Sequence, residues 1–324
     1  MKNVFKDDRF QGFNKKDKYF EGWYFKAVSK DQKQSLALIP GVSLAKDDQH
    51  AFIQVFVYVN EGQSSVSNHY FRFDIKDFVA KKDKFFVKIK ENTFSLEGVN
   101  IHLEDLDTSI KGQYTITNPV KLPKSLFQPS IMGPFAYLPK MECYHGILSV
   151  DHEVKGQMLY NDKLLDFNNG SGYVEKDYGK SFPKGYVWIQ TNNFDEKHTS
   201  LFVSVAAIPY LGLTFNGFIV NFYYNHKHFR FATYNFSKIK VEIVDGKSVH
   251  YVFKKGKYQL EVTAVIEDFV MLASPKFGKM DHTIKEGLSG KVTVKLTKKG
   301  ETLYRGDASS AGIEIMKPPT LKTR

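Results

Sequence analysis

Most of the chain alternates apolar and polar side chains with the period of two that is typical of β-strands. The runs are short and rich in β-branched and aromatic residues, the clearest being 51–59, 69–75, 85–89, 110–117, 251–254, 258–266 and 291–296. Turn sequences such as Glu97-Gly98, Asp245-Gly246 and Lys299-Gly300 recur at hairpin spacing, which favours antiparallel meanders. No amphipathic helix longer than two turns is indicated. We therefore expect an all-β fold, with short helical pieces around 283–287 or within 123–140.

The length and a faint internal repeat predict two domains. A chain of 324 residues is about twice the usual domain size. The segment 21–25 (EGWYF) opens a first run of strands that ends at Gly179, and the segment 185–190 (GYVWIQ) opens a second. We expect two consecutive antiparallel β-barrel or sandwich domains, at 1–180 and 181–316, followed by a flexible tail at 317–324.

The net charge of +11 does not indicate a nucleic-acid partner, because of the kind of residue that carries it. Of the 46 basic residues only five are arginines, and the lysines are spread along the whole chain. Proteins that read nucleic-acid sequence depend on the bidentate guanidinium group, which is scarce here. We expect no nucleic-acid partner and infer no obligate protein partner.

The sequence contains no clear targeting or membrane-spanning segment. The first 18 residues are charged throughout and lack the apolar core of a secretory signal. The most apolar stretch, Leu201–Tyr224, is interrupted by Pro209, Asn216 and Asn221, whereas a spanning helix needs about 20 mainly apolar residues. We read it as two buried strands around a turn at Pro209. A cytoplasmic protein is expected, at most peripheral to the inner face of the membrane.

Motifs for cofactors and metals are incomplete. Two Gly-Lys-Ser sequences, at 179–181 and 246–248, lack the preceding glycine of a phosphate-binding loop. Cys143 is the only cysteine, so it supports neither an intramolecular disulfide nor a cysteine-rich zinc site. His226 and His228 have metal-ligand spacing, but no third ligand is spaced to join them, and solvated histidines at a hairpin tip are the favoured interpretation. We expect neither cofactor nor metal.

The densest group of polar and aromatic residues lies between 131 and 183. Glu175 and Asp177 are two apart, so on a strand both carboxyl groups share one face. If that face is enclosed, mutual repulsion favours a proton on one of them. The alternative, favoured by spacing alone, is that Lys176 or a lysine on a neighbouring strand pairs with them. Glu142 and His145 are also close in sequence, but on opposite strand faces.

Five sequence blocks resemble the tocopherol cyclase family, in the family's order. They are YFEGWYFK (19–26), MGPFAYLPKMECYHGILS (132–149), GSGYVEKDYGKSFP (170–183), YVWIQTNNF (186–194) and RFATYN (230–235). The family usually has Trp at the position of Tyr178. The family is similar in turn to a group of carotenoid hydratases and Diels–Alderases built from two lipocalin-like β-domains. The resemblance thus implies two consecutive lipocalin-like domains, in agreement with the strand pattern.

The resemblance implies a cofactor-free isomerase acting on a hydrophobic small molecule. Such an enzyme closes a chromanol ring by adding a phenol hydroxyl across a prenyl double bond, which requires an acid, a base and exclusion of water. Asp177 or Glu175 is the expected proton donor, and Glu142 or His145 the expected acceptor of the phenol proton. The expected pocket walls are Trp23, Tyr24, Tyr178 and Trp188, and the expected partners of the hydroquinone oxygens are Gln190, Asn192 and Asn216. A lipocalin-like carrier without catalysis and a hydratase of an isoprenoid alkene remain open alternatives.

Overall fold

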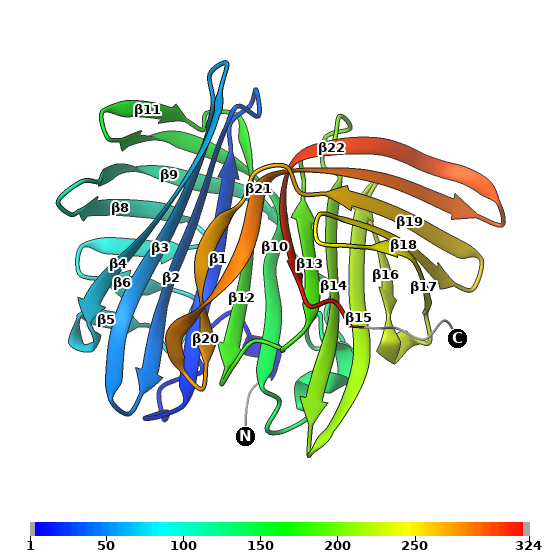
Figure 1. Ribbon diagram of the computed structural model, residues 1–324, viewed down its shortest axis with the longest axis horizontal. Helices are drawn as coiled ribbons and strands as arrows, with labels where there is room; N and C mark the ends of the chain where they lie inside the picture. Colours follow the sequence, from blue (N-terminus) through cyan, green and yellow to red (C-terminus); the bar gives the residue numbers. More distant parts are fainter. Residues whose placement is uncertain (1–3, 320–324) are drawn as a thin grey trace. The chain divides into compact units, whose positions relative to one another are not determined.

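The computed structural model describes residues 4–319, and across this range the chain is almost entirely β-structure (Figure 1). The predicted all-β class is confirmed. The chain forms two compact units. Unit 1 comprises the chain up to Leu138, Cys143–Phe182 and Ala273–Thr283, and unit 2 comprises Pro139–Glu142, Pro183–Leu272 and the chain from Ile284 onward. The boundaries predicted at residues 180 and 316 stay a prediction, and residues 320–324 of the predicted tail lie outside the described residues.

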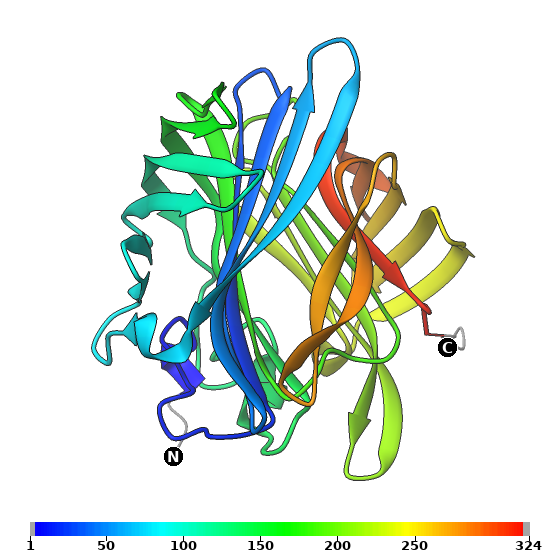
Figure 2. The ribbon, with the colours of Figure 1, turned by 60° about the vertical axis from the view of Figure 1, so that its left-hand side comes forward.

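Unit 1 is built on one antiparallel sheet with the strand order β4-β3-β2-β1-β12-β10-β9-β8-β7-β6-β5, and β11 pairs with β10. Figure 2 shows β1–β4 (blue) side by side and strongly twisted. The strands are β1 (Tyr19–Val28), β2 (Gln34–Ala45), β3 (Asp48–Asn60), β4 (Ser64–Asp74), β5 (Phe78–Ala80), β6 (Val87–Ile89), β7 (Asn92–Ser95), β8 (Gly98–Glu104), β9 (Ser109–Val120), β10 (Cys143–Tyr160), β11 (Lys163–Asp166) and β12 (Gly170–Gly179).

Alternation along β1 decides which face of this sheet packs on the apolar core. Trp23 and Phe25 point to one face, where both stack on Phe85 with ring centroids 5.6 and 6.0 Å apart. Tyr24 and Lys26 take the opposite face, as the two-residue period requires. Both faces of β1 are nevertheless buried, so polar side chains on the second face lie out of water.

Most of the second antiparallel sheet lies in unit 2; its strand order is β16-β15-β14-β13-β22-β21-β19-β18-β17, with β20 pairing with β21. The core of unit 2 is formed by the alternate apolar residues of these strands, Val187, Ile189, Val203 and Phe222 among them. The strands are β13 (Tyr186–Thr191), β14 (Ser200–Tyr210), β15 (Leu213–Tyr224), β16 (Lys227–Ala232), β17 (Lys238–Val244), β18 (Ser248–Lys255), β19 (Tyr258–Val265), β20 (Val270–Lys276), β21 (Lys279–Lys298) and β22 (Glu301–Met316).

The turn between β20 and β21 belongs to unit 1 and is held there by hydrogen bonds. The Ser43 hydroxyl donates to the Gly278 carbonyl at 2.6 Å, and the Gln54 amide donates to the Ala273 carbonyl at 3.0 Å. A segment remote in sequence from β2 and β3 thus completes unit 1.

Helical structure in the part of the chain that the structure describes is confined to 3-10 helices of three to five residues. These are η1 (Val4–Lys6), η2 (Ile75–Asp77), η3 (Gly133–Tyr137) and η4 (Thr233–Asn235). The helical piece expected within 123–140 is therefore present, whereas 283–287 lies inside β21 and that prediction is wrong. Between residues 4 and 319, no helix combines the length and the apolar character needed to cross a bilayer.

The apolar stretch 201–224 forms two strands as expected, but the turn lies at Leu211-Gly212 and not at Pro209. Pro209 sits within β14, opposite Thr214 of β15. Proline is tolerated there because β13 does not extend past Ala206, so this end of β14 is an edge that pairs with β15 alone.

Candidate active site

Three predicted site residues are brought together by the pairing of β10 with β12. Glu175 and Asp177 lie two apart on β12 and share one face, as the alternation predicts. The register places His145 of β10 directly opposite Asp177, so its imidazole projects from the same face as the two carboxylates. The period of two predicts that His145 and Glu142 lie on opposite faces. It does not predict that His145 lies opposite Asp177, because that depends on the register between two strands.

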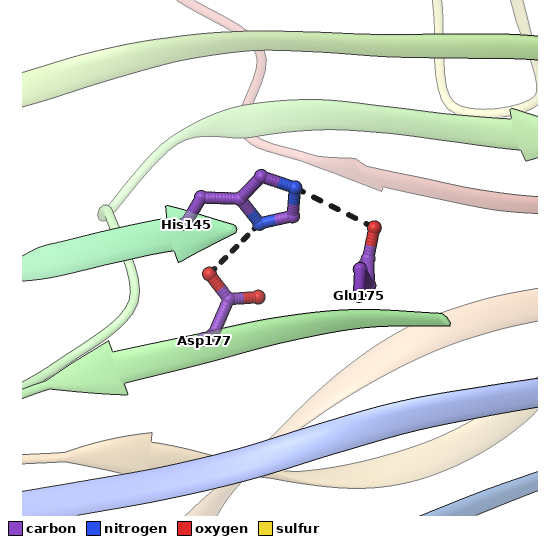
Figure 3. A group of neighbouring side chains, drawn as sticks. All are labelled: His145, Glu175 and Asp177. Carbon is purple, nitrogen blue, oxygen red and sulfur yellow. Dashed lines mark hydrogen bonds and ion pairs between the residues drawn. The ribbon is translucent and has the colours of Figure 1, made fainter. Parts of the chain in front are cut away.

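The imidazole of His145 lies between the two carboxylates (Figure 3). Its Nδ1 atom is 3.0 Å from Oδ1 of Asp177, and its Nε2 atom is 3.5 Å from Oε2 of Glu175. The side chains of His145 and Glu175 are only 16% and 6% exposed. We refer to His145, Glu175 and Asp177 as the triad.

The two carboxylates keep His145 protonated at neutral pH. Burial alone would lower the pKa of the imidazole, but the negative charges of Asp177 and then Glu175, with the hydrogen bond to Asp177, outweigh it and raise the pKa to about 9. At pH 7 the triad therefore holds a proton on an imidazolium that contacts two possible acceptors.

Two further side chains donate to the triad carboxylates. The Tyr173 hydroxyl donates to Oε2 of Glu175 at 2.7 Å, and burial followed by the charge of Glu175 raises the pKa of Tyr173 well above its ordinary value. The Cys143 thiol lies 3.4 Å from Oδ1 of Asp177 and donates to it. Sequence reasoning missed Tyr173, although the same period of two that joins Glu175 and Asp177 points to it.

The neighbouring strand β1 adds two buried residues to the same face. Tyr24 pairs in register with Glu175, and Lys26 pairs with Tyr173. Tyr24 is 8% exposed and Lys26 is 1% exposed. Tyr24 is thus on the triad face, as its predicted role requires. Lys26 was not among the predicted site residues, although it ends the first of the family-like sequence blocks.

Lys176 does not pair with the triad, so that half of the alternative favoured by spacing alone is wrong. The other half, a lysine on a neighbouring strand, stays a prediction, since Lys26 of β1 lies on the triad face. Lys176 projects from the other face of β12, where its ammonium lies 2.6 Å from Glu21, and both side chains are fully buried. Lys176 also donates to the backbone carbonyls of Asp7 and Arg9. The N-terminal segment therefore closes over this ion pair.

Trp23 and Tyr178, predicted as pocket walls, lie on the Lys176 side of the sheet. The Lys176 ammonium is 5.1 Å from the Trp23 ring centroid and 4.7 Å from that of Tyr178. The indole of Trp23 donates to the Asp8 carbonyl at 3.2 Å. The structure does not bring these two rings to the triad face. Trp23 pairs in register with Lys176, and Tyr178 is two residues after Lys176 on the same strand, so both rings share the face of Lys176.

The other predicted site residues belong to unit 2. Trp188 and Gln190 project from the face of β13 opposite to its core residues, and both are buried. Asn192 follows β13 and is buried, and Asn216 is exposed on β15. Glu142 immediately precedes β10 but is part of unit 2. The roles predicted for these five residues stay predictions.

The triad is also the one group of three potential metal ligands among the described residues, with ligand atoms within 4.8 Å of one another. A cation would have to displace the imidazole proton, which the raised pKa of His145 opposes.

His226 and His228, whose spacing is that of metal ligands, each contact a neighbouring polar side chain. His228 Nδ1 contacts the Asn221 side-chain oxygen at 3.2 Å, and His226 Nδ1 lies 3.5 Å from the Tyr223 hydroxyl.

The fold and this site define an all-β protein of the lipocalin-like class with a buried carboxylate–imidazolium group. Residues 96–316 match the family model described as tocopherol cyclase-like, and the chain belongs to that family. The resemblance seen in the sequence is thereby confirmed. The match includes four of the five sequence blocks and all three triad residues; the block at 19–26 lies outside it. No curated protein matches the sequence significantly.

Solved structures with the same fold have little sequence identity to this chain. CghA has a TM-score of 0.57 at 10% identity, with 94% of this chain and 90% of CghA covered. A protein assigned as AttH from Nitrosomonas europaea has a TM-score of 0.53 at 15% identity, with 91% of both chains covered. Kievitone hydratase from Nectria haematococca has a TM-score of 0.52 at 8% identity, with 92% of this chain and 88% of the hydratase covered. These likenesses support the lipocalin-like fold.

Proposed function

We propose that this protein is a cyclase that closes a chromanol-type ring in a prenylated hydroquinone by acid catalysis. The observation that carries the proposal is the triad, in which His145 holds a proton within reach of Glu175 and Asp177. Membership of the tocopherol cyclase-like family supports an enzyme of the cyclase or hydratase type.

The proposed first step is delivery of a proton to the alkene of the prenyl tail. An alkene is a very weak base, so the acid must be positioned against it and must be strong. In water-filled surroundings the triad proton resides on His145. An apolar substrate that covers the triad removes water, and low polarity favours neutral imidazole and neutral carboxylic acid over the ion pair. Asp177, which has the shorter contact to His145, is the proposed donor.

The second step is capture of the cation. The phenol oxygen attacks the tertiary carbon as the proton arrives at its neighbour, forming the C–O bond of the new ring. The phenol proton then passes to Glu175 or to neutral His145, which restores the resting proton count of the triad. No atom is gained or lost, so the reaction is an isomerisation that needs no redox partner.

The surroundings of the triad suit a reaction through a cation. Tyr24 and Tyr173 are buried on the same face, and aromatic rings stabilise positive charge without acting as nucleophiles in the way water does. The Tyr173 hydroxyl donates its hydrogen bond to Glu175, which holds the carboxylate beside the imidazole.

The test is cyclisation of a prenylated hydroquinone by purified wild type, D177N and E175Q. The amides keep the shape of the side chains, but D177N removes the proposed proton donor and E175Q removes a carboxylate that contacts the imidazolium and can accept the phenol proton. We therefore expect losses of at least about a hundredfold. E91Q, which alters an exposed carboxylate in the β6–β7 turn, serves as the matched control and should retain full activity. Full activity in both triad variants would overturn the proposal.

Product analysis separates this proposal from the two alternatives. A cyclase yields the chromanol, with the same mass as the quinol. A hydratase yields a tertiary alcohol with the mass of one added water, and a carrier returns the quinol unchanged in native mass spectrometry. Either of the last two results contradicts the proposal.

A further inference from the structure

The β14–β15 hairpin extends beyond its neighbours in the sheet of unit 2. Pairing of β13 begins at Tyr186, opposite Ala206, and pairing of β16 ends at Ala232, opposite Ile219. Residues 208–215 therefore pair only with one another. We call this segment the arm; both views show it projecting at the end of the sheet (Figures 1 and 2).

The tip of the arm exposes large apolar side chains. Leu211 is 74% exposed and Leu213 is 76% exposed, and Tyr210 beside them is partly exposed. No Asp, Glu, Lys or Arg occurs between Thr199 and His226. An isolated two-stranded ribbon in water would ordinarily carry polar residues at such a tip.

The turn itself makes the choice of leucine unusual. Leu211 and Gly212 both have positive φ, of 51° and 82°, as in a two-residue type I′ turn. Asn or Asp is the favoured residue at the first position, because their side chains tolerate this backbone. Leucine at position 211 is therefore unfavourable for two reasons, its backbone conformation and its exposure.

Positive charge flanks the base of the arm. The Ala207 amide donates to the Gly185 carbonyl at 2.9 Å, which places the exposed Lys184 beside the base. Tyr186 pairs with Met316, so the exposed Lys317 lies next to the same point. An exposed aromatic residue lies on the other side of the base. The Phe218 amide donates to the Thr233 hydroxyl at 2.9 Å, and Phe236, which follows η4, is 94% exposed.

We propose that the arm docks the protein on an anionic lipid bilayer, with Leu211 and Leu213 entering the acyl region and Lys184 and Lys317 contacting headgroups. Apolar side chains at a tip with lysines behind them match the layers of such an interface. A protein partner fits less well, because a stable interface buries about 800 Å² on each side, and a narrow convex tip offers no such area.

The test is co-sedimentation with vesicles of equal parts phosphatidylcholine and phosphatidylglycerol, without substrate, so the result does not depend on the proposed reaction. The variant L211N/L213T keeps residues suited to the turn and strand and removes the apolar tip. We expect its partition coefficient to fall at least tenfold, roughly the contribution of one buried leucine. L106N, which alters a fully exposed leucine in a turn of unit 1, should bind like wild type.

The role of the two lysines is tested by a separate measurement. K184Q/K317Q should lower binding by about fivefold per lysine at low salt, and pure phosphatidylcholine vesicles should bind wild type more weakly. The proposal is overturned if wild type does not sediment with anionic vesicles or if L211N/L213T binds as wild type does. It is also overturned if wild type forms a dimer in solution that L211N/L213T abolishes, since the tip would then pair with a second copy of this chain.

Discussion

Replacing His145 with Gln removes the positive charge that lies between Glu175 and Asp177. In the native protein the imidazolium lies 3.0 Å from Asp177 and 3.5 Å from Glu175. Glutamine fills a similar space and still donates a hydrogen bond, but it carries no positive charge at any pH. The variant therefore isolates the charge on His145 from its shape.

The expected effect on stability follows from the pKa of His145. Folding raises this pKa from 6.5 to about 9, so protonation favours the folded state. At 1.36 kcal/mol per pKa unit the difference amounts to about 3 kcal/mol. This contribution is fully present below the unfolded pKa, declines as the pH rises from there, and is lost once the pH has passed the folded pKa. The advantage of wild type over H145Q should thus shrink by about 3 kcal/mol between about pH 6 and about pH 10.

The assay is urea unfolding of wild type and H145Q at a series of pH values. H102Q, which replaces an exposed histidine near Glu104, is the matched control and should track wild type throughout. Proton NMR of the His145 ring in wild type measures the same pKa directly. A stability difference between wild type and H145Q that is constant with pH would refute the reasoning, as would a His145 pKa near 6.5.

Three further predictions concern groups that support the site or the fold. Tyr173→Phe removes the hydroxyl that donates to Glu175 and should cost about 1.5–3 kcal/mol in urea unfolding, as hydrogen bonds to charged groups do; an unchanged stability would contradict the contact. Lys176→Met leaves Glu21 buried without its cation and should cost about 3–5 kcal/mol, and adding Glu21→Gln should restore part of that loss; a double variant less stable than the single one would count against this account. Gly41→Ala places a methyl group 2.5 Å from an aromatic ring carbon and 2.7 Å from a backbone oxygen, so its melting temperature should fall, with a loss of at least about 2 kcal/mol.

The all-β class and the shared face of two of the three triad residues were predictable because strand alternation is a local property. Two residues of spacing suffice to put Glu175 and Asp177 on one face. Placing His145 opposite Asp177 requires the register between β10 and β12, which no local pattern encodes. Bulges in β10 between Ile147 and Ser149 and between Ser149 and His152 make that register harder still to infer.

The face assignment of the aromatic residues was missed for a similar reason. Trp23 and Tyr24 are neighbours in a family-like block, yet they project to opposite faces of β1 because the period is two. Deciding which face holds the core needs the positions of remote residues such as Phe85. The pairing of Lys176 with Glu21 likewise depends on β1 lying beside β12, across more than a hundred residues of sequence.

The central claim is that the triad delivers a solvent-exchangeable proton to an alkene while a phenol oxygen closes the ring. The most direct measurement is incubation of the wild-type protein with a prenylated hydroquinone in deuterium oxide, followed by mass spectrometry and NMR of the product. The account predicts a chromanol with a single deuterium on the ring carbon next to the newly formed C–O carbon, and no such product with D177N. A chromanol without deuterium at that carbon, or recovery of unchanged quinol from the wild-type protein, would contradict it.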